Sequence, residues 1–304
     1  MAQPDALLIE AREVLPGRWL QTWEAPLVAT AVQPGQYVHV IGAGIGLGGG
    51  AIGPGSSTPA GGSFRPGGLL EALPVSGFDR PAGLIRLHLG RGRDGVGSGI
   101  ATLRVGDRTR LTGPLGRGFQ VGPRSLHLLL VADAAGLPRI QSLAEDAVAT
   151  GRRVVLLLEA PSAGSVYPSS LLANEVEYVV ATADGSLGHH GSATDLVPDY
   201  EAWADQCFAA GSTDLTTRLA ALARGRDGRL GVARLGRKRG RRPAPPDRAQ
   251  LRRKAWLQLA VDHEMSCALG VCLGCVVMGV AGPLRACREG PVFAAEELSE
   301  AEPA

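Results

Sequence analysis

Near its C-terminus the chain reads Cys267-Ala268-Leu269-Gly270-Val271-Cys272-Leu273-Gly274-Cys275, and Cys287 follows after a stretch long enough for one hairpin. The first three cysteines have the spacing C-x4-C-x2-C, which is typical of loops that hold a [2Fe–2S] cluster through thiolates. Small residues let such a loop wrap closely round a cluster, and Gly270 and Gly274 can adopt conformations that a Cβ would forbid. The four cysteines therefore predict an electron carrier.

Two other interpretations of the cysteines stay open. Zinc also takes four cysteines, but zinc ribbons usually pair two C-x2-C knuckles, and here only Cys272 and Cys275 form such a knuckle. Alternatively, the cysteines are small buried residues grouped by chance. Disulfides are not expected, because Met1–Asp5 lacks the basic region of a signal peptide and cytoplasmic thiols stay reduced. We therefore expect a cytoplasmic location.

The composition bounds the fold class and the partners. The chain has 304 residues, enough for two or three small domains, with 45% hydrophobic but only 4% aromatic residues. No apolar run is long enough to span a bilayer. A net charge of +2 gives no reason to expect nucleic-acid binding. The exception is residues 224–254, a basic linker or insertion in which Arg237–Arg242 could dock an acidic partner.

Strand patterns dominate residues 1–122. Alternating apolar residues predict strands at 7–11, 19–24, 36–40, 83–89 and 108–112, with Pro-Gly turns between the first three. A Gly-rich insertion covers residues 42–68. We interpret residues 1–122 as an antiparallel β-barrel.

The pattern changes after residue 122. Continuous apolar strands at 127–132, 153–158, 176–181 and 206–210 alternate with helical patterns at 138–150 and 214–224. This alternation predicts an α/β domain with a parallel sheet of the nucleotide-binding type over residues 123–223. The basic segment 224–254 and a cysteine module at 255–304 complete the expected organisation.

Several motifs carry a resemblance to a known family. The chain reads R-A-C-R-E-G-P-V-F over Arg285–Phe293, G-P-L-G-R-G-F over Gly113–Phe119, and T-A-D-G-S-L-G-H-H-G over Thr182–Gly191. These motifs and the domain order resemble the electron-transfer subunit of bacterial NAD-dependent dihydroorotate dehydrogenase, in the ferredoxin–NADP reductase superfamily. The resemblance implies that Cys267, Cys272, Cys275 and Cys287 bind a [2Fe–2S] cluster.

The resemblance also implies a role and a flavin site. A partner catalytic subunit holds FMN and oxidises dihydroorotate, in pyrimidine biosynthesis, and electrons pass through the cluster and FAD to NAD⁺, in a complex expected to be a heterotetramer. No catalytic residue is expected in this subunit. The family's R-P-x-S flavin motif corresponds to Leu73-Pro74-Val75-Ser76, where leucine replaces the arginine that pairs with a flavin phosphate. The remaining expected FAD contacts are His88, Leu89, Gly90, Gly97 and Ser98.

The expected NAD site departs further from the family. The family's G-G-x-G-x-A-P loop is replaced by Asp133-Ala134-Ala135-Gly136-Leu137-Pro138, and Asp133 brings a negative charge to the approach of the dinucleotide phosphates. Cys207 is expected to be a small buried residue facing the same side of its strand as Ala209. Two alternative functions therefore stay open: a reductase subunit for another partner, and an electron relay or regulatory subunit that has lost NAD binding.

Overall fold

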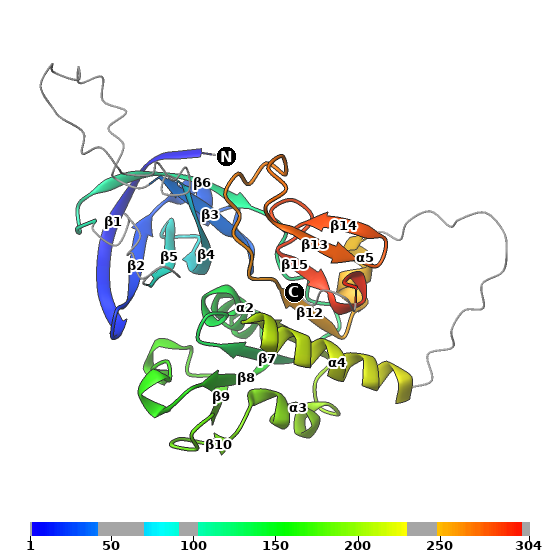
Figure 1. Ribbon diagram of the computed structural model, residues 1–304. Coiled ribbons are helices and arrows are strands. Elements are labelled where there is room, and N and C mark those ends of the chain that lie inside the picture. The colour runs from blue at the N-terminus through cyan, green and yellow to red at the C-terminus, as the bar shows by residue number, and fades with distance from the viewer. Residues whose placement is uncertain (1, 42–69, 91–102, 230–247, 300–304) are drawn as a thin grey trace, which may run out of the picture.

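The first part of the chain is a closed β-barrel (Figure 1). The computed structural model describes residues 2–41, 70–90, 103–229 and 248–299, so the predictions for residues 42–68, Gly97, Ser98 and Arg237–Arg242 lie outside the described residues. The barrel strands, in the order β1-β2-β5-β4-β3-β6, are β1 (Ala2–Leu15), β2 (Arg18–Glu24), β3 (Tyr37–Ile41), β4 (Leu70–Asp79), β5 (Leu84–Leu89) and β6 (Arg108–Leu115). A short helix, α1 (Pro26–Ala29), follows β2. The predicted antiparallel barrel is confirmed.

A seven-stranded sheet follows, with strand order β10-β9-β8-β7-β11-β12-β15. Its strands are β7 (His127–Asp133), β8 (Arg153–Ala160), β9 (Val176–Thr182), β10 (His189–His190), β11 (Gln206–Ala210), β12 (Leu257–Ala260) and β15 (Val292–Ala294). All neighbouring pairs are parallel except β12 with β15. The predicted parallel-sheet domain is therefore confirmed, and its apolar runs are central strands buried on both faces.

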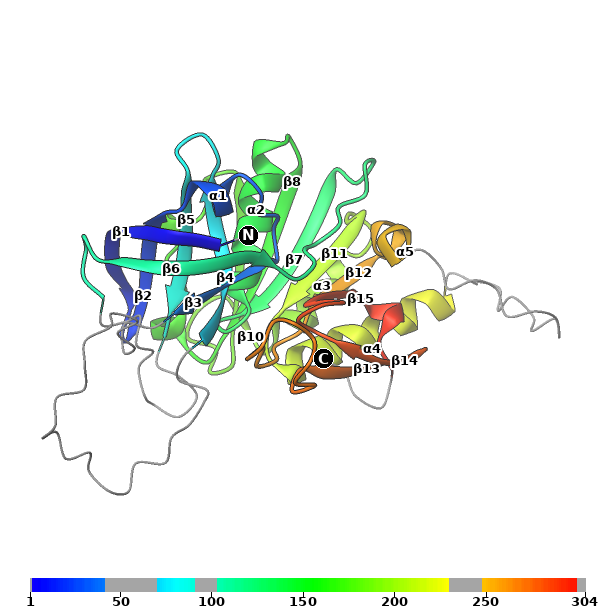
Figure 2. The same cartoon turned by 90° about the horizontal axis from the view of Figure 1, so that it is seen from above.

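Helices cover both faces of this sheet (Figure 2). They are α2 (Leu137–Ala149) on one face, and α3 (Ala193–Tyr200) and α4 (Thr213–Arg229) on the other. Cys207 and Ala209 pack with α3 and α4, whereas Phe208 and Ala210 pack with α2. Cys207 is fully buried and faces the same side as Ala209, as the strand periodicity predicted.

Two strands of the cysteine module, β12 and β15, belong to the seven-stranded sheet. The module also contains α5 (Arg248–Lys254) and a hairpin of β13 (Val276–Gly279) and β14 (Gly282–Arg285). The expected boundary at residue 255 therefore runs through a region that shares the sheet of the preceding domain. The described ends of the basic segment 224–254 are helical, in α4 and α5, and the basic linker or insertion expected there stays a prediction. Three short 3-10 turns complete the secondary structure, at Ala163–Ser165, Ser169–Leu171 and Ala295–Glu297.

Near its C-terminal end the basic segment contains a buried arginine, Arg252. The Arg252 side chain is 2% exposed, and its Nε donates to Glu297 Oε2 at 2.8 Å. Its Nη2 donates to the Glu289 carbonyl at 2.7 Å. Because a buried guanidinium needs both a counter-charge and hydrogen-bond acceptors, this contact fixes α5 against the end of the cysteine module. Arg252 is thus a structural residue, although its neighbours in sequence suggested a solvated charge run.

Several contacts join the barrel to the sheet and to the cysteine module. On β5, the Arg86 guanidinium forms an ion pair with Glu145 of α2, and His88 Nε2 lies 3.0 Å from Gln141 Oε1 of the same helix. After β6, the Arg117 amide donates to the Gly290 carbonyl at 2.5 Å. Two of the motifs that carried the family resemblance therefore meet in the fold. Among the described residues, no helix is long and apolar enough to cross a membrane.

Candidate functional site

The β13–β14 hairpin brings two of the four cysteines side by side. Cys275 directly precedes β13 and Cys287 follows β14, and the Ala286 amide donates to the Cys275 carbonyl at 2.8 Å. Both cysteine side chains are buried. Cys267 and Cys272 lie on the preceding loop, where Cys267 is half-buried and Cys272 is exposed. The fold therefore places two thiols, Cys275 and Cys287, in the interior and two, Cys267 and Cys272, nearer the surface.

The backbone of this loop directs amide groups at sulfur. The amide of Leu269 donates to Cys267 Sγ at 3.4 Å, and that of Gly274 donates to Cys272 Sγ at 3.5 Å. Ala268 and Leu273 adopt left-handed conformations with φ of 51° and 58°, which are unusual for residues with a Cβ. Amide donors favour the thiolate form that a metal requires, and they lower the pKa of Cys267 to about 6.

The four thiols lie close enough to influence one another: Cys272 acts on Cys267, and both Cys275 and Cys267 act on Cys287, whose amide also donates to Cys275 Sγ at 3.4 Å. Burial raises the pKa of Cys287 to about 12, and the neighbouring Cys275 adds to the effect. Within the described ranges, no group of three or more His, Cys, Asp or Glu side chains is arranged to hold a single metal ion. Two thiolates for each of two irons is the ligand pattern of a [2Fe–2S] cluster, so this donor set fits such a cluster.

The outer face of the loop is apolar. The side chains of Leu269, Val271 and Leu273 are 69%, 72% and 62% exposed, and Val280 on the adjoining hairpin turn is 70% exposed. Because backbone amides of the loop point inward toward the sulfur atoms, the side chains of Leu269, Val271 and Leu273 point outward. We call Leu269, Val271 and Leu273 the apolar rim, because Val280 lies at the other end of the hairpin from the cysteines. Such a cluster of exposed apolar residues is typical of a protein–protein contact surface.

A pocket of about 440 Å³ lies between the barrel and the α/β domain; we call it the interdomain pocket. Its lining on the barrel side includes Arg18, Leu73, Pro74, His88, Leu89 and Gly90, and on the α/β side it includes Ala134, Ala135, Arg139 and Tyr167. It therefore collects five of the residues that sequence reasoning assigned to FAD. The other four are Val75 and Ser76, which are absent from its lining, and Gly97 and Ser98, which lie outside the described residues.

The side chains of the expected flavin motif point in different directions. Leu73 and Val75 pack in the barrel core, because alternate residues of β4 face inward. Ser76 is buried, and its hydroxyl donates to the Arg86 carbonyl at 3.1 Å. Pro74 borders the pocket and pairs in register with Tyr37 of β3. Among the four motif positions, Leu73 and Pro74 thus reach the pocket.

One wall of the interdomain pocket contains two polar rings, those of His88 on β5 and of Tyr167, which lies between the first two 3-10 turns. The His88 ring lies 5.5 Å from the Tyr167 ring, and burial lowers the pKa of His88 to about 4. The Tyr167 side chain is 4% exposed and lies beside the Gln141 side chain, so its hydroxyl belongs to the packed wall of the pocket.

Arg18 and Arg139 are pocket residues that sequence reasoning missed. Arg18 begins β2, and its Nη1 donates to the Ala134 carbonyl at 2.6 Å across the pocket. Arg139 pairs with Asp262 at 2.5 Å. No local pattern signals either residue, because their position depends on how the barrel docks on α2.

The loop after β7, where a dinucleotide was expected, is held by its own carboxylate. Asp133 Oδ1 accepts from the amides of Ala135 at 2.9 Å and Gly136 at 2.8 Å, and Oδ2 accepts from the Ser212 amide at 2.7 Å. This carboxylate lies between β7 and β11, where the strand order reverses and where open α/β sheets usually bind ligands. The backbone amides that would donate to a dinucleotide phosphate here already donate to the Asp133 carboxylate.

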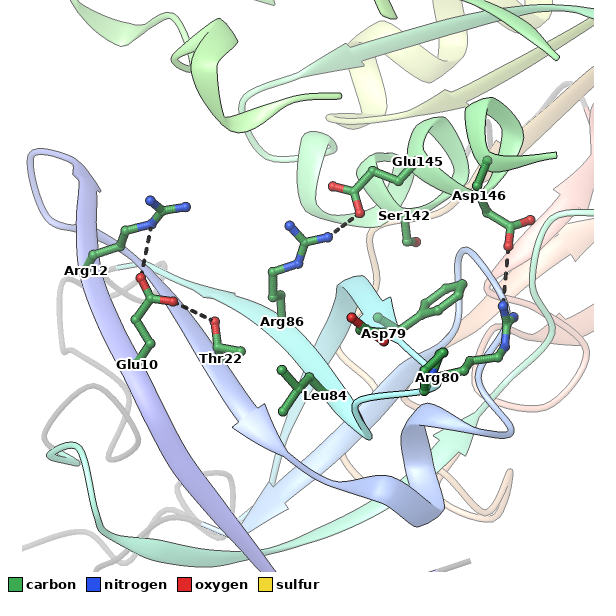
Figure 3. A pocket seen from close by; sticks show the side chains of 13 residues that line it. Glu10, Arg12, Thr22, Asp79, Arg80, Leu84, Arg86, Ser142, Glu145 and Asp146 are labelled. Carbon is green, nitrogen blue, oxygen red and sulfur yellow. Dashed lines mark hydrogen bonds and ion pairs between the residues drawn. The ribbon is translucent and has the colours of Figure 1, made fainter. Parts of the chain in front are cut away.

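A second, larger pocket of about 700 Å³ lies outside the barrel against α2 (Figure 3). It is lined by charged side chains that pair with each other. Arg80–Asp146 and Arg86–Glu145 join the barrel to α2, and Arg12–Glu10 lies along β1. Burial raises the pKa of Glu145, against the opposing effect of Arg86. Since each arginine already has a carboxylate partner, this groove is a weaker candidate for a ligand than the interdomain pocket.

Comparison with known sequences identifies the cysteine module. Residues 262–299 match the family model for the iron–sulfur cluster binding domain of dihydroorotate dehydrogenase B. The electron transfer subunit of dihydroorotate dehydrogenase B (NAD(+)) from Desulforamulus reducens is 25% identical over 299 residues, which covers 95% of each chain. The same subunit from Geobacillus kaustophilus is 28% identical over 284 residues, or 91% of each chain.

Solved structures share the fold. The structure of an NADH-dependent reduced ferredoxin-NADP oxidoreductase superposes with a TM-score of 0.68 at 19% identity, covering 98% of this chain and 90% of that one. An Amycolatopsis cytochrome P450 reductase has a TM-score of 0.53 at 20% identity, covering 73% of this chain and 66% of its own. The expected resemblance is thereby confirmed: this chain is similar over most of its length to the dihydroorotate dehydrogenase B electron transfer subunits, and its residues 262–299 match the model of their iron–sulfur cluster binding domain.

Proposed function

We propose that this chain is the electron transfer subunit of a dihydroorotate dehydrogenase of the B type, which passes electrons from an FMN-containing catalytic subunit to NAD⁺. The observation that carries the proposal is the loop and hairpin that bring four thiols together, in a chain similar over 95% of its length to such a subunit. The role belongs to pyrimidine biosynthesis, and the reduced thiols it needs fit a cytoplasmic location.

In this proposal Cys267, Cys272, Cys275 and Cys287 hold a [2Fe–2S] cluster, which supplies one-electron transfer when bound. The chain's own contribution is to shape the loop and to direct amides at the sulfurs, as for Leu269 and Gly274. Such hydrogen bonds and burial tune the reduction potential of a cluster.

We assign FAD to the interdomain pocket. The arginine at position 18 and the apolar wall of Leu73 and Leu89 support this assignment. Strand β3 links this pocket to the cysteines. Tyr37 of β3 pairs with Pro74, and its hydroxyl donates to the Cys287 carbonyl at 3.3 Å. Flavin and cluster sites on either side of one strand suit electron transfer between them.

We assign the docking of the catalytic subunit to the apolar rim. The rim lies on the same loop as the outer thiols, Cys267 and Cys272, so a partner seated there would bring its own cofactor close to the cluster. Burial of the rim would also exclude water from the cluster. We propose that two copies of each subunit form the complex.

A second candidate function is an electron relay that has lost NAD binding. The observation that favours it is the Asp133 carboxylate, which occupies the amides of Gly136 and Ser212 at the expected phosphate position. A dinucleotide phosphate would have to displace this carboxylate from the two amides and would then lie close to its negative charge.

Anaerobic titration of the purified chain with NADH separates the two candidates. The electron transfer subunit should show bleaching of flavin and cluster absorption by stoichiometric NADH, because reducing equivalents can enter at the flavin from a nicotinamide. A relay should be reduced by dithionite but not by NADH. A chain that dithionite also leaves unchanged would contradict both functions.

A further inference from the structure

The flavin-motif strand β4 supplies no cation for a flavin phosphate. The family's arginine is replaced by Leu73, whose side chain is 6% exposed and packs in the barrel core. An anionic phosphate held in a partly buried pocket needs a charge-assisted donor. If FAD binds here, another residue must provide that donor.

Arg18 lies in the right position to replace it. In the barrel order, β5 lies between β2 and β4. Trp19 pairs with Leu89, and Val75 pairs with Leu87, so the start of β2, the end of β5 and the Leu73 region of β4 lie at the same end of the barrel. Positions 18 and 73 are thus two strand spacings apart, or about 10 Å. Both border the interdomain pocket.

The Arg18 guanidinium is also available for an anion. It is exposed and makes one hydrogen bond, to the Ala134 carbonyl, which leaves several of its N–H donors for a ligand. Within the described part of the chain it forms no ion pair with a carboxylate. The other arginine of the pocket, Arg139, is neutralised by Asp262. Arg18 is therefore the cation of this pocket whose charge is not balanced by a described carboxylate.

We propose that Arg18 binds a phosphate of the flavin dinucleotide and takes over the role that an arginine at position 73 has in related chains. The inference rests on the proposed flavin site. The guanidinium reaches the phosphate from β2 while its bond to Ala134 keeps it spanning the pocket. The leucine on β4 and the arginine on β2 then belong to one site.

The test compares how riboflavin and FAD bind to wild type, Arg18→Ala and Arg18→Lys, by flavin fluorescence titration of the purified apoprotein. Riboflavin has no phosphate. We expect Arg18→Ala to weaken FAD binding about 10- to 100-fold, as for loss of a charge-assisted hydrogen bond, and to leave riboflavin binding unchanged. Arg18→Lys should recover part of the loss, since it restores the charge without the planar fork.

Arg12→Ala is the matched control. Arg12 is exposed on the neighbouring strand β1 and pairs with Glu10 outside the interdomain pocket, so its loss should leave FAD binding unchanged. Equal weakening of riboflavin and FAD by Arg18→Ala would overturn the proposal, because it would report a change in pocket shape. Unchanged FAD binding in Arg18→Ala would overturn it as well. A wild-type chain that binds neither flavin would overturn the flavin site itself.

Discussion

At the scale of single residues, His88 connects the barrel to α2 as a neutral side chain. Its ring is packed against Tyr167, and its Nε2 meets the Gln141 side chain at 3.0 Å. Burial lowers the pKa of His88 from 6.5 to about 4. The unfolded chain therefore takes up a proton at this residue at a pH where the folded chain does not.

This difference predicts a pH-dependent stability. The contribution of His88 is complete above about pH 6.5 and is lost as the pH falls toward about 4, because only the unfolded state is protonated in that window. We expect the free energy of unfolding to drop by about 1 kcal/mol more in wild type than in His88→Gln between about pH 7.5 and about pH 5.5. Urea denaturation at both pH values measures it. His189→Gln, at an exposed position, should behave as wild type, and an equal drop in His88→Gln would contradict the assignment.

Residues differ in how far the sequence alone could predict them. The four cysteines are recognisable because an iron–sulfur loop fixes the spacing of its ligands. Arg18, Tyr37 and Tyr167 are not recognisable, because nothing in their local sequence states which side chains they will face. Their roles come from the register of three barrel strands and from the docking of the barrel on α2.

At the scale of elements, β3 joins the two candidate cofactor sites. Tyr37 and His39 point from β3 toward the cysteine module, with their rings 5.8 Å apart. Tyr37 donates to the Cys287 carbonyl, and His39 Nε2 lies 2.7 Å from the Met265 carbonyl. Since a carbonyl only accepts, the histidine must donate there. One strand thus fixes both the start and the end of the cysteine segment against the barrel.

The β7–α2 loop depends on Asp133 for its stability. The carboxylate satisfies three amides, including those of Gly136 and Ser212 at the start of two helices. We expect Asp133→Ala to lower the free energy of unfolding by about 1–3 kcal/mol and Asp133→Asn, which keeps one acceptor oxygen, to cost less. Thermal or urea unfolding measures both. Asp79→Ala is the control, because Asp79 accepts from one amide in an exposed turn. A loss no larger than that of Asp79→Ala would refute the account of this loop.

Element types were predictable where the periodicity was strong. The apolar runs of β7, β8 and β9 and the helical pattern of α2 agree with the structure to within two residues at most ends. Pattern alone missed β4, whose alternation is interrupted by Pro74 and Gly77, and only the flavin motif pointed to it. It also missed α5, because its arginines resemble a solvated charge run until Arg252 is seen buried against Glu297.

At the scale of the whole molecule, the apolar rim is the surface that should meet the catalytic subunit. We expect the combined change Leu269→Ser, Val271→Ser and Leu273→Ser to weaken the complex with the catalytic subunit by at least about 10-fold, since large exposed apolar side chains each contribute on the order of 1 kcal/mol or more when buried. Iron content should not change. Analytical ultracentrifugation of the mixed subunits measures the effect.

The control for the rim uses apolar residues elsewhere on the surface. Val105 and Leu126 are 61% and 58% exposed and lie away from the cysteine module. The double change Val105→Ser and Leu126→Ser should leave complex formation unchanged. If it weakens the complex as much as the rim variant, the docking surface has been assigned to the wrong face.

The arrangement of the whole molecule explains why the sequence indicated the cluster more strongly than the flavin and the dinucleotide sites. The cluster loop is local, and its ligands come from one stretch of about 20 residues whose spacing is diagnostic. The interdomain pocket is assembled from β2, β4, β5, α2 and the segment before β9, which lie far apart in sequence. A replaced arginine on one of these elements can be compensated from another, and only the assembled fold shows it.

The central claim is that the four cysteines hold a binuclear iron–sulfur cluster in a chain that also binds a flavin. Its most direct test is the iron, acid-labile sulfide, zinc and flavin content of the anaerobically purified protein, measured for wild type, Cys287→Ser and Cys207→Ala. The account predicts about two irons, two sulfides and one FAD per wild-type chain, loss of iron and sulfide in Cys287→Ser, and their retention in Cys207→Ala, whose residue is buried in the sheet core. About one zinc per wild-type chain, without sulfide, would contradict it.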